Sequence, residues 1–275
     1  MDSSIGLEIR KSRLFNKKSN RAFVVALDHG ILMGPIQGIE NIADTVSKVT
    51  KGGADAIQVT PPVAQAIREN FFGRGSPALI ARLDHSNYWR ATPAPKPGYY
   101  TKIFTVKDAV RVDADAVVTY LLTGFEDDRQ EAENLRSLAD MVREAQDYGM
   151  PIIIEPLGLE KGSQAVRNES IIKLAVRMAT EIGADFLKVD YTGEKNSFKA
   201  IVGSTFAPIL VRGGPKTKTI QESFKMVKDS LDCGAKGIVF GRNVWQAPDI
   251  TKMTKTLSGL VHGELNVKQA AKMVK

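Results

Sequence analysis

The apolar positions of this chain fall into short runs that recur along its whole length. Four of the runs follow a similar turn, in which glycine or aspartate stands beside alanine, and such a turn would end a preceding helix. Apolar runs of this length, each closing on polar residues, indicate strands that are buried on both faces. The pattern predicts eight strands, within residues 21–30, 52–61, 78–86, 112–121, 150–158, 182–191, 207–215 and 233–242.

The segments between these runs are mostly helical in period. Residues 126–149 begin with acids and end on glycine, and residues 168–183 begin with an Asn/Ser cap. Eight strand–helix units in about 250 residues predict a (β/α)8 barrel, because an open doubly wound sheet usually has fewer strands and a glycine-rich first turn. We therefore expect one barrel domain over 1–275, with an N-terminal extension (about 1–20) and a C-terminal helix. The proline-rich stretch 92–100 reads as a long loop after the third strand.

Composition and charge disfavour several classes of protein, namely membrane-spanning, secreted and nucleic-acid-binding ones. No apolar run approaches the ~20 residues that span a bilayer, and the first residues lack the apolar core of a secretory signal, so we expect a cytoplasmic protein without membrane contact. The net charge of +7 is spread along the chain without a nucleic-acid-binding motif, which favours an anionic small molecule over nucleic acid as the partner. The single cysteine, Cys233, excludes an intrachain disulfide.

Polar side chains stand where the predicted strands end. In a (β/α)8 barrel these ends converge on one mouth, which is where such enzymes place their active sites. The candidate residues are Asp28, His29, Thr60, Asp84, His85, Thr123, Glu155, Lys188, Asp190, Arg212, Gly213, Gly214, Gly241, Arg242 and Asn243.

Lys188 lies inside the apolar run of the sixth strand, where an unpaired charge is costly. If Leu187 and Val189 face the helices, strand alternation turns Lys188 toward the barrel axis. A desolvated lysine beside other cations has a lowered pKa and can attack a ketone to form a Schiff base. The alternative is a structural ion pair of Lys188 with Asp190 or Glu155.

Two glycine turns follow the seventh and eighth strands. Barrels commonly bind phosphate at this place through backbone amides. Gly213 and Gly214 would let the backbone approach an anion, and Gly241 with Arg242 would add amide and guanidinium donors. The turns therefore predict a phosphate site, although such glycines can also serve only to make tight turns.

Two Asp-His pairs, Asp28 with His29 and Asp84 with His85, are of residue types that bind metals. Nothing in their spacing fixes a coordination geometry, and Schiff-base chemistry does not require a metal. We expect neither a metal nor another cofactor. Asp28 is a better candidate for moving protons beside the reacting lysine, or for capping the loop that follows it.

With Lys188 and these turns in place, the chain resembles the archaeal-type class I fructose-bisphosphate aldolase family, which also includes 2-amino-3,7-dideoxy-D-threo-hept-6-ulosonate synthases and phospho-autoinducer-2 thiolases. The matching stretches are ALDHGILMGP (26–35), LKVDYTG (187–193), VRGGPKT (211–217) and GIVFGRNVWQ (237–246). The resemblance implies a Schiff base at Lys188, acid–base work by Asp28, phosphate binding at Gly213, Gly214, Gly241 and Arg242, and a ring-based homo-oligomer, often a decamer. We also expect His29 and Arg212 to bind the substrate or its phosphate.

One stretch departs from the family pattern. Aldolases of this family carry a Tyr-Pro-Arg-Gly type sequence after the fifth strand, and here Glu155 and Leu157 stand in place of the tyrosine and arginine. A carboxyl group can transfer the proton instead if burial raises its pKa, which a protonated Lys188 would oppose. Tyr120 and Tyr191 are other candidate donors. The departure puts fructose bisphosphate itself in doubt and leaves the lysine chemistry intact.

The sequence thus predicts an aldolase that forms an imine with a phosphorylated ketose and makes or breaks the adjacent C–C bond. A transaldol-type synthase or a thiolase of the same family is the alternative within the enzyme class. From another class, a barrel that binds a phosphorylated metabolite without catalysis fits the same residues, and it would hold Lys188 in a permanent salt bridge.

Overall fold

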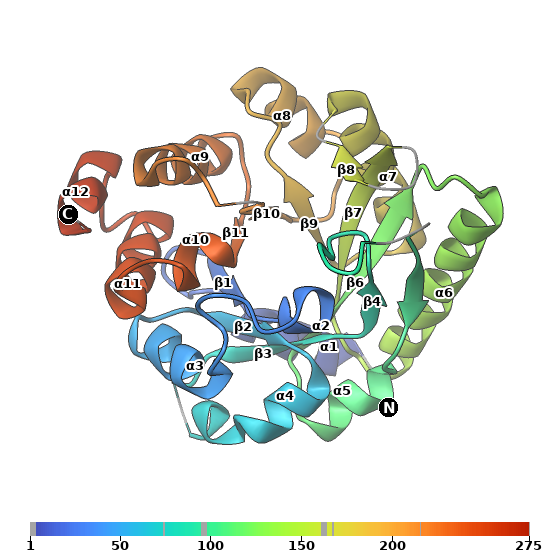
Figure 1. Ribbon diagram of the computed structural model, residues 1–275, viewed down its shortest axis with the longest axis horizontal. Helices are drawn as coiled ribbons and strands as arrows, with labels where there is room; N and C mark the ends of the chain where they lie inside the picture. Colours follow the sequence, from blue (N-terminus) through green and yellow to red (C-terminus); the bar gives the residue numbers. More distant parts are fainter. Residues whose placement is uncertain are drawn as a thin grey trace.

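Eight parallel strands close into a barrel, as the apolar runs predict (Figure 1). The computed structural model describes residues 4–73, 75–94, 98–160, 164–166, 168–214 and 216–274. The strands pair in the order β1, β2, β3, β6, β7, β9, β10 and β11, and β11 pairs again with β1. Their bounds are β1 Ala22–Ala26, β2 Ala56–Val59, β3 Ala78–Arg82, β6 Ala116–Thr123, β7 Ile152–Glu160, β9 Phe186–Asp190, β10 Ile209–Arg212 and β11 Gly237–Phe240.

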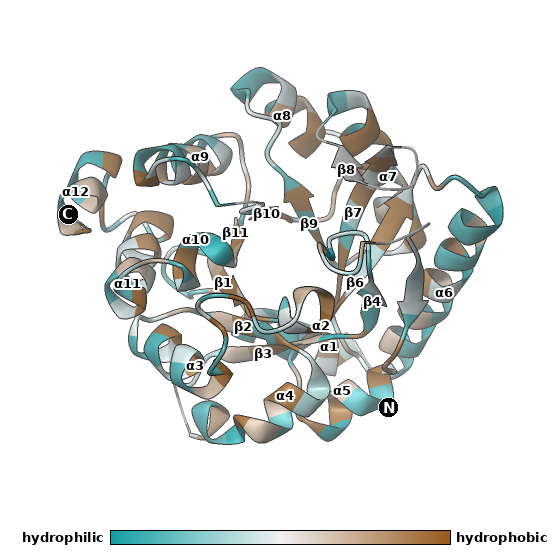
Figure 2. Ribbon diagram, viewed as in Figure 1, coloured by the Kyte–Doolittle hydropathy of each residue, from teal (hydrophilic) through white to brown (hydrophobic). Residues whose placement is uncertain are grey.

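Helices surround the barrel and turn their apolar faces toward it (Figure 2). The predicted helix within 126–149 is α6, and the one within 168–183 is α7, where the Asn168 side chain accepts a hydrogen bond from Ser170 N. The helices are α1 Ser4–Arg13, α2 Gly30–Met33, α3 Ile42–Lys51, α4 Pro61–Ala66, α5 Val106–Arg111, α6 Asp128–Asp147, α7 Glu169–Ile182, α8 Lys195–Val202, α9 Ile220–Asp232, α10 Arg242–Trp245, α11 Ile250–Val261 and α12 Val267–Met273, with a 3₁₀ turn η1 Arg68–Phe71.

Strand alternation separates two apolar layers and confirms the predicted direction of Lys188. Leu187 and Val189 belong to the large core between strands and helices, whereas Phe186 belongs to a second cluster inside the barrel. Leu14 joins this inner cluster from the segment after α1, and the ring of Phe15 lies 5.3 Å from that of Phe186. Apolar side chains therefore close the amino-terminal end of the barrel and leave polar ones for the other end.

Two short antiparallel additions do not follow from the apolar pattern. After β3 the chain forms a hairpin of β4 Asp84–Ser86 and β5 Tyr100–Lys102, and β8 Gln164–Val166 pairs back onto β7. The predicted loop 92–100 lies largely within the connection of the β4–β5 hairpin, and its residues 95–97 lie outside the described residues. Among the helices described, none is long and apolar enough to cross a membrane.

Candidate active site

Lys188 lies in the barrel interior, near the carboxyl end of β9. Its side chain is 7% exposed, and Nζ lies 2.9 Å from Glu155 Oε2 on β7 and 3.5 Å from Gln58 Oε1 on β2. Of the two predicted partners for a structural ion pair, the structure shows Glu155. The amine is therefore both buried and held in place.

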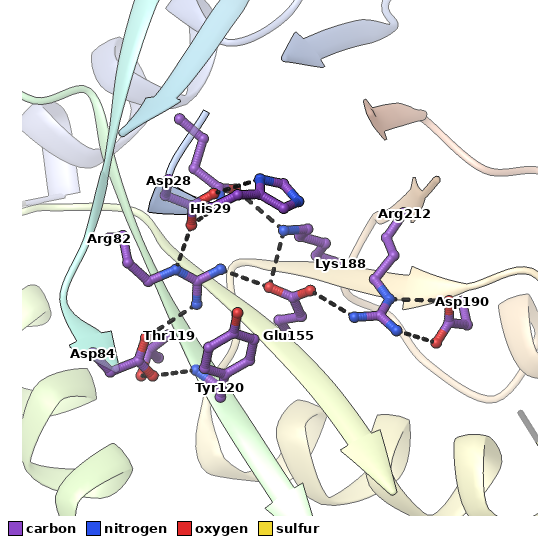
Figure 3. A network of polar contacts seen from close by, with 11 residues as sticks. Asp28, His29, Arg82, Asp84, Thr119, Tyr120, Glu155, Lys188, Asp190 and Arg212 are labelled. Atoms are coloured by element: carbon purple, nitrogen blue, oxygen red, sulfur yellow. Dashed lines mark hydrogen bonds and ion pairs between the residues drawn. The ribbon is translucent and has the colours of Figure 1, made fainter. Parts of the chain in front are cut away.

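Arg82, on β3, connects the carboxylates around this lysine (Figure 3). Its Nε, Nη1 and Nη2 donate to Asp28 (2.7 Å), Asp84 (3.0 Å) and Glu155 (2.7 Å), and its guanidinium carbon lies 4.0 Å from the centre of the Tyr120 ring. The Arg82 side chain is 1% exposed. Because a guanidinium is planar and rigid, these contacts fix the positions of the three carboxylates relative to β3.

Further hydrogen bonds hold Asp190, Glu155 and Asp84 in place. Arg212 donates from Nε and Nη2 to Asp190, at 3.0 and 2.9 Å, and from Nη1 to Glu155 Oε1 at 3.2 Å. Asp84 also accepts from the Thr119 hydroxyl at 2.7 Å and from the backbone amide of Tyr120. Arg212 lines the cavity, but these donors are directed at protein carboxylates, and its predicted contact with the substrate stays a prediction.

The three cations keep Glu155 ionised. Burial alone would raise the pKa of Glu155, but the charges of Lys188, Arg82 and Arg212 outweigh it and hold the pKa well below its usual range. Asp28 behaves in the same way, because Arg82 and Lys188 overcome the effect of its burial and lower its pKa. In this arrangement Glu155 rests as a carboxylate at neutral pH, so it can donate a proton only after it has taken one up within the catalytic cycle.

Burial disfavours charge on the Lys188 amine and the His29 imidazole. Burial lowers the pKa of Lys188, and the charge of Glu155 only partly opposes this. Burial also lowers the pKa of His29 to about 4, so this imidazole is neutral at pH 7. Lys188 is thus closer to the free amine than an exposed lysine, and His29 can bind a substrate through hydrogen bonds but not through charge.

The turns after β10 and β11 lie against each other. A Cβ at Gly213 would come within 2.9 Å of the Phe240 ring, and one at Gly241 would lie 2.6 Å from His29 Cε1. Asn243 Oδ1 accepts from Thr217 N at 3.0 Å, so the residue after Arg242 fastens the two turns together. The Gly213 amide donates to Val239 O within the sheet, which leaves the other groups of these turns as the better candidates for holding an anion.

These groups surround one cavity of about 450 Å³ at the carboxyl ends of the strands. It brings together the residues to which the sequence assigns a catalytic or binding role: Asp28, His29, Glu155, Lys188, Arg212, Gly213, Gly214, Gly241 and Arg242 all line it. The candidates by position alone are not part of its lining: Thr60, Asp84, His85, Thr123, Asp190 and Asn243. A cavity of this size is typical of small-molecule sites.

Sequence reasoning missed several residues of the site. Arg82 and Gln58 lie inside apolar strands, as Lys188 does. A polar side chain within a buried apolar run is unusual, and this signal in the sequence could have identified both residues. Trp89 and Arg90 reach the cavity from the connection between β4 and β5. No periodicity could have placed them, because their position depends on how that connection folds back.

Metal ligation finds no support in the described ranges. Among these residues, no group of three or more His, Cys, Asp or Glu side chains is arranged to hold a metal ion. The positions between Asp28, Asp84 and Glu155 are taken by the Arg82 guanidinium.

Comparison with known families agrees with this geometry. The model of the DeoC/LacD family aldolases matches residues 22–247. The chain belongs to the DeoC/LacD aldolase family. Proteins to which it is similar include an uncharacterized aldolase of Saccharolobus solfataricus, 49% identical over 98% of this chain and 100% of the relative, and the 2-amino-3,7-dideoxy-D-threo-hept-6-ulosonate synthase of Halobacterium salinarum, 31% identical over 91% and 90%.

Solved structures of aldolases share the barrel. An archaeal fructose 1,6-bisphosphate aldolase superposes with a TM-score of 0.79 at 28% identity, covering 94% of this chain and 99% of that one. A second structure of an archaeal fructose-1,6-bisphosphate aldolase, with the same TM-score and identity and covering 94% and 100%, has its catalytic lysine covalently bound to the carbinolamine intermediate of the substrate. The (β/α)8 barrel and the aldolase family are thereby confirmed.

Proposed function

We propose that this family member is a class I aldolase that binds a phosphorylated ketose and joins it to Lys188 as a Schiff base. One observation carries the proposal: a buried lysine amine with a lowered pKa faces a cavity that two glycine turns and Arg242 also line. The solved archaeal aldolase whose catalytic lysine carries a carbinolamine supports the assignment, because the two chains share the fold at 28% identity.

Imine formation can use the proton shared by Lys188 and Glu155. Transfer of a proton across the 2.9 Å contact gives a free amine and a carboxylic acid. The amine attacks the ketone carbon to form a carbinolamine, and the acid returns its proton to the departing hydroxyl, which leaves as water. The iminium then keeps the positive charge and Glu155 is again a carboxylate, so its low pKa favours the completed step.

C–C cleavage requires a base for the hydroxyl of the substrate. Asp28 Oδ2 accepts from Gln58 Nε2 at 2.6 Å and from Arg82, whereas Oδ1 has no hydrogen bond within the described part of the chain. We assign Oδ1 to take the hydroxyl proton as the C–C bond breaks and its electrons move into the iminium. The aldehyde leaves, and the enamine remains on Lys188 until it is protonated and hydrolysed.

Arg242 is expected to hold the phosphate of the ketose. Arg242→Ala should weaken binding of a phosphorylated substrate by roughly 2–3 kcal/mol, the contribution of a charge-assisted hydrogen bond to a buried anion. The measurement is KM for a phosphorylated ketose and for its unphosphorylated counterpart. Equal KM changes for both, or none for either, would count against the phosphate site.

Glu155→Gln separates proton transfer from ion pairing. The variant should still form a borohydride-reducible adduct but turn over ~10²–10⁴-fold more slowly, the usual contribution of general acid–base catalysis. Because the charge of Glu155 raises the pKa of Lys188, its loss should also move the pH profile of adduct formation to lower pH. Glu181→Gln, in an exposed ion pair with Arg177, is the control. Wild-type turnover in Glu155→Gln contradicts the catalytic role.

A synthase is the second candidate, favoured by the Halobacterium salinarum relative and by Glu155 in the place of the family tyrosine. Dihydroxyacetone phosphate offered with a panel of aldehydes, and read by product mass, tests aldol chemistry directly. A condensation product is expected with at least one aldehyde. Absence of product with all of them, together with the observed Lys188–Glu155 ion pair, would favour a barrel that only binds a phosphorylated metabolite.

Assembly into a ring-based homo-oligomer stays a prediction from the resemblance.

A further inference from the structure

Gln58, on β2, lies inside the barrel between Asp28 and Lys188. Its neighbours Ile57 and Val59 belong to the core outside the barrel, so strand alternation turns Gln58 inward, where it is 1% exposed. Its Nε2 donates to Asp28 Oδ2 at 2.6 Å, and its Oε1 accepts from Lys188 Nζ across a longer distance of 3.5 Å. One amide therefore links the base of the proposed cleavage step to the nitrogen that would carry the substrate.

The two partners fix the direction in which the amide of Gln58 points. Although burial opposes ionisation, the charges of Arg82 and Lys188 keep the pKa of Asp28 below its ordinary value, so this carboxylate is ionised at neutral pH. An ionised carboxylate only accepts hydrogen bonds and an ammonium only donates them, so Nε2 must face Asp28 and Oε1 must face Lys188. A free amine and a protonated imine also carry an N–H group, so Oε1 suits the Lys188 nitrogen at each step.

Gln58 and Arg82 hold the same oxygen of Asp28. Arg82 Nε donates to Oδ2 at 2.7 Å (Figure 3), beside the 2.6 Å bond from Gln58 Nε2. A carboxylate with one donor can turn about its Cβ–Cγ bond and keep that donor, whereas donors from two strands restrict the rotation. Oδ1, which makes no hydrogen bond within the described ranges, is thereby held in one place for the hydroxyl of a substrate.

We propose that Gln58 is a positioning residue, which fixes the Asp28 carboxylate relative to the Lys188 nitrogen so that Oδ1 meets the hydroxyl of the bound substrate. Gln58 does not line the cavity, so it acts through Asp28 and not on the substrate itself. The inference rests on the proposed function, because Asp28 acts only after a ketose is joined to Lys188. It goes beyond that function in assigning to Gln58 the C–C bond step and not the formation of the imine.

Gln58→Met tests this assignment, because methionine has a similar length but no N–H group to donate. The variant should form the borohydride-reducible adduct with dihydroxyacetone phosphate at close to the wild-type rate. Its kcat for condensation with the aldehyde that the wild type uses best should fall about 10- to 100-fold, the effect of a misplaced catalytic group, while KM changes little. Gln65→Met, at an exposed position on the following helix α4, is the matched control and should change neither rate.

Gln58→Glu separates positioning from packing. The carboxyl group keeps the size of the amide and an acceptor for Lys188, but it can donate to Asp28 only while it is protonated. At neutral pH its charge should repel that of Asp28 and slow condensation. The rate relative to the wild type at the same pH should recover as the pH falls and the two carboxyl groups bind a proton. A side chain that only fills space would give no such recovery.

A crystal structure of Gln58→Met shows the position of Asp28 without any reaction, and the carboxylate should adopt more than one orientation there. A single orientation as in the wild type would overturn the inference. Equal slowing of adduct formation and condensation would also overturn it, because Gln58 would then act through Lys188 or the fold. Absence of a trapped adduct on the wild type would instead remove the proposed function, and the variant structure would still decide whether Gln58 positions Asp28.

Discussion

Lys188→Met is expected to abolish turnover while the barrel stays folded. Methionine fills a similar volume but has no amine to attack a ketone, so no imine can form. The fold should tolerate the change, because Glu155 keeps its contacts with Arg82 and Arg212. Activity and the thermal unfolding temperature, measured on the same preparation, check both parts of this expectation.

Lys195→Met is the matched control for this variant. Lys195, the first residue of α8, is half exposed and is not part of the cavity lining. It pairs with Asp229 and Asp232 on α9. It should retain wild-type activity. If Lys188→Met retained more than a few per cent of activity, the lysine could not be the nucleophile.

Arg82→Met is expected to destabilise the fold strongly. It removes the shared partner of three buried carboxylates, and breaking a buried ion pair from one side costs about 3–5 kcal/mol. Urea unfolding at pH 7 should show this loss in the free energy of unfolding. Arg82→Lys should lose less, because it keeps the charge without the three-way geometry.

The loss of unfolding free energy in Arg82→Met should become smaller as the pH falls. Arg82 lowers the pKa values of Asp28 and Glu155, so its removal raises them and lets these groups take up protons inside the fold. Wild-type stability owed to such lowered pKa values is present above the unfolded-state pKa and is lost at lower pH. The difference between variant and wild type should therefore be smaller at pH 3, which is below the unfolded-state pKa values of about 4, than at pH 7. An equal difference at both pH values would contradict this account of Arg82.

The fold could be predicted because each buried strand is a short apolar run after a helix-ending turn. Alternation within 186–190 was enough to turn Lys188 inward, and the inner and outer clusters confirm it. The β4–β5 hairpin could not be predicted in the same way, since its connection is rich in proline and has no apolar period. The position of Trp89 and Arg90 depends on that hairpin, and so it emerged only from the structure.

The residues that end the strands could be predicted as part of the site, but the buried residues that contact them could not. Residues that end strands are visible in the sequence as polar positions after apolar runs, and those with a predicted catalytic or binding role line one cavity. Arg82 and Gln58 lie deeper in their strands and contact Asp28, so their role is defined by partners from other strands. Sequence can mark such residues as anomalous, but only the closed barrel shows which carboxylates they join.

Glu155 shows why the chemistry of a residue does not follow from its type. The sequence suggests a proton donor with a raised pKa, whereas three cations lower that pKa in the folded chain. We propose that the carboxylate, which rests ionised, acts by taking a proton from Lys188 and returning it within the catalytic cycle. This assignment makes Glu155 a partner of the amine and leaves the substrate hydroxyl to Asp28.

Borohydride reduction in the presence of dihydroxyacetone phosphate tests the central claim most directly. Only an imine is reduced to a stable secondary amine, so the wild type should gain the mass of one reduced ligand per chain, and peptide mapping should place it on Lys188. Glucitol 6-phosphate, which has no keto group, should leave no adduct. A wild-type chain without added mass, or with the mass on another lysine, would contradict the account.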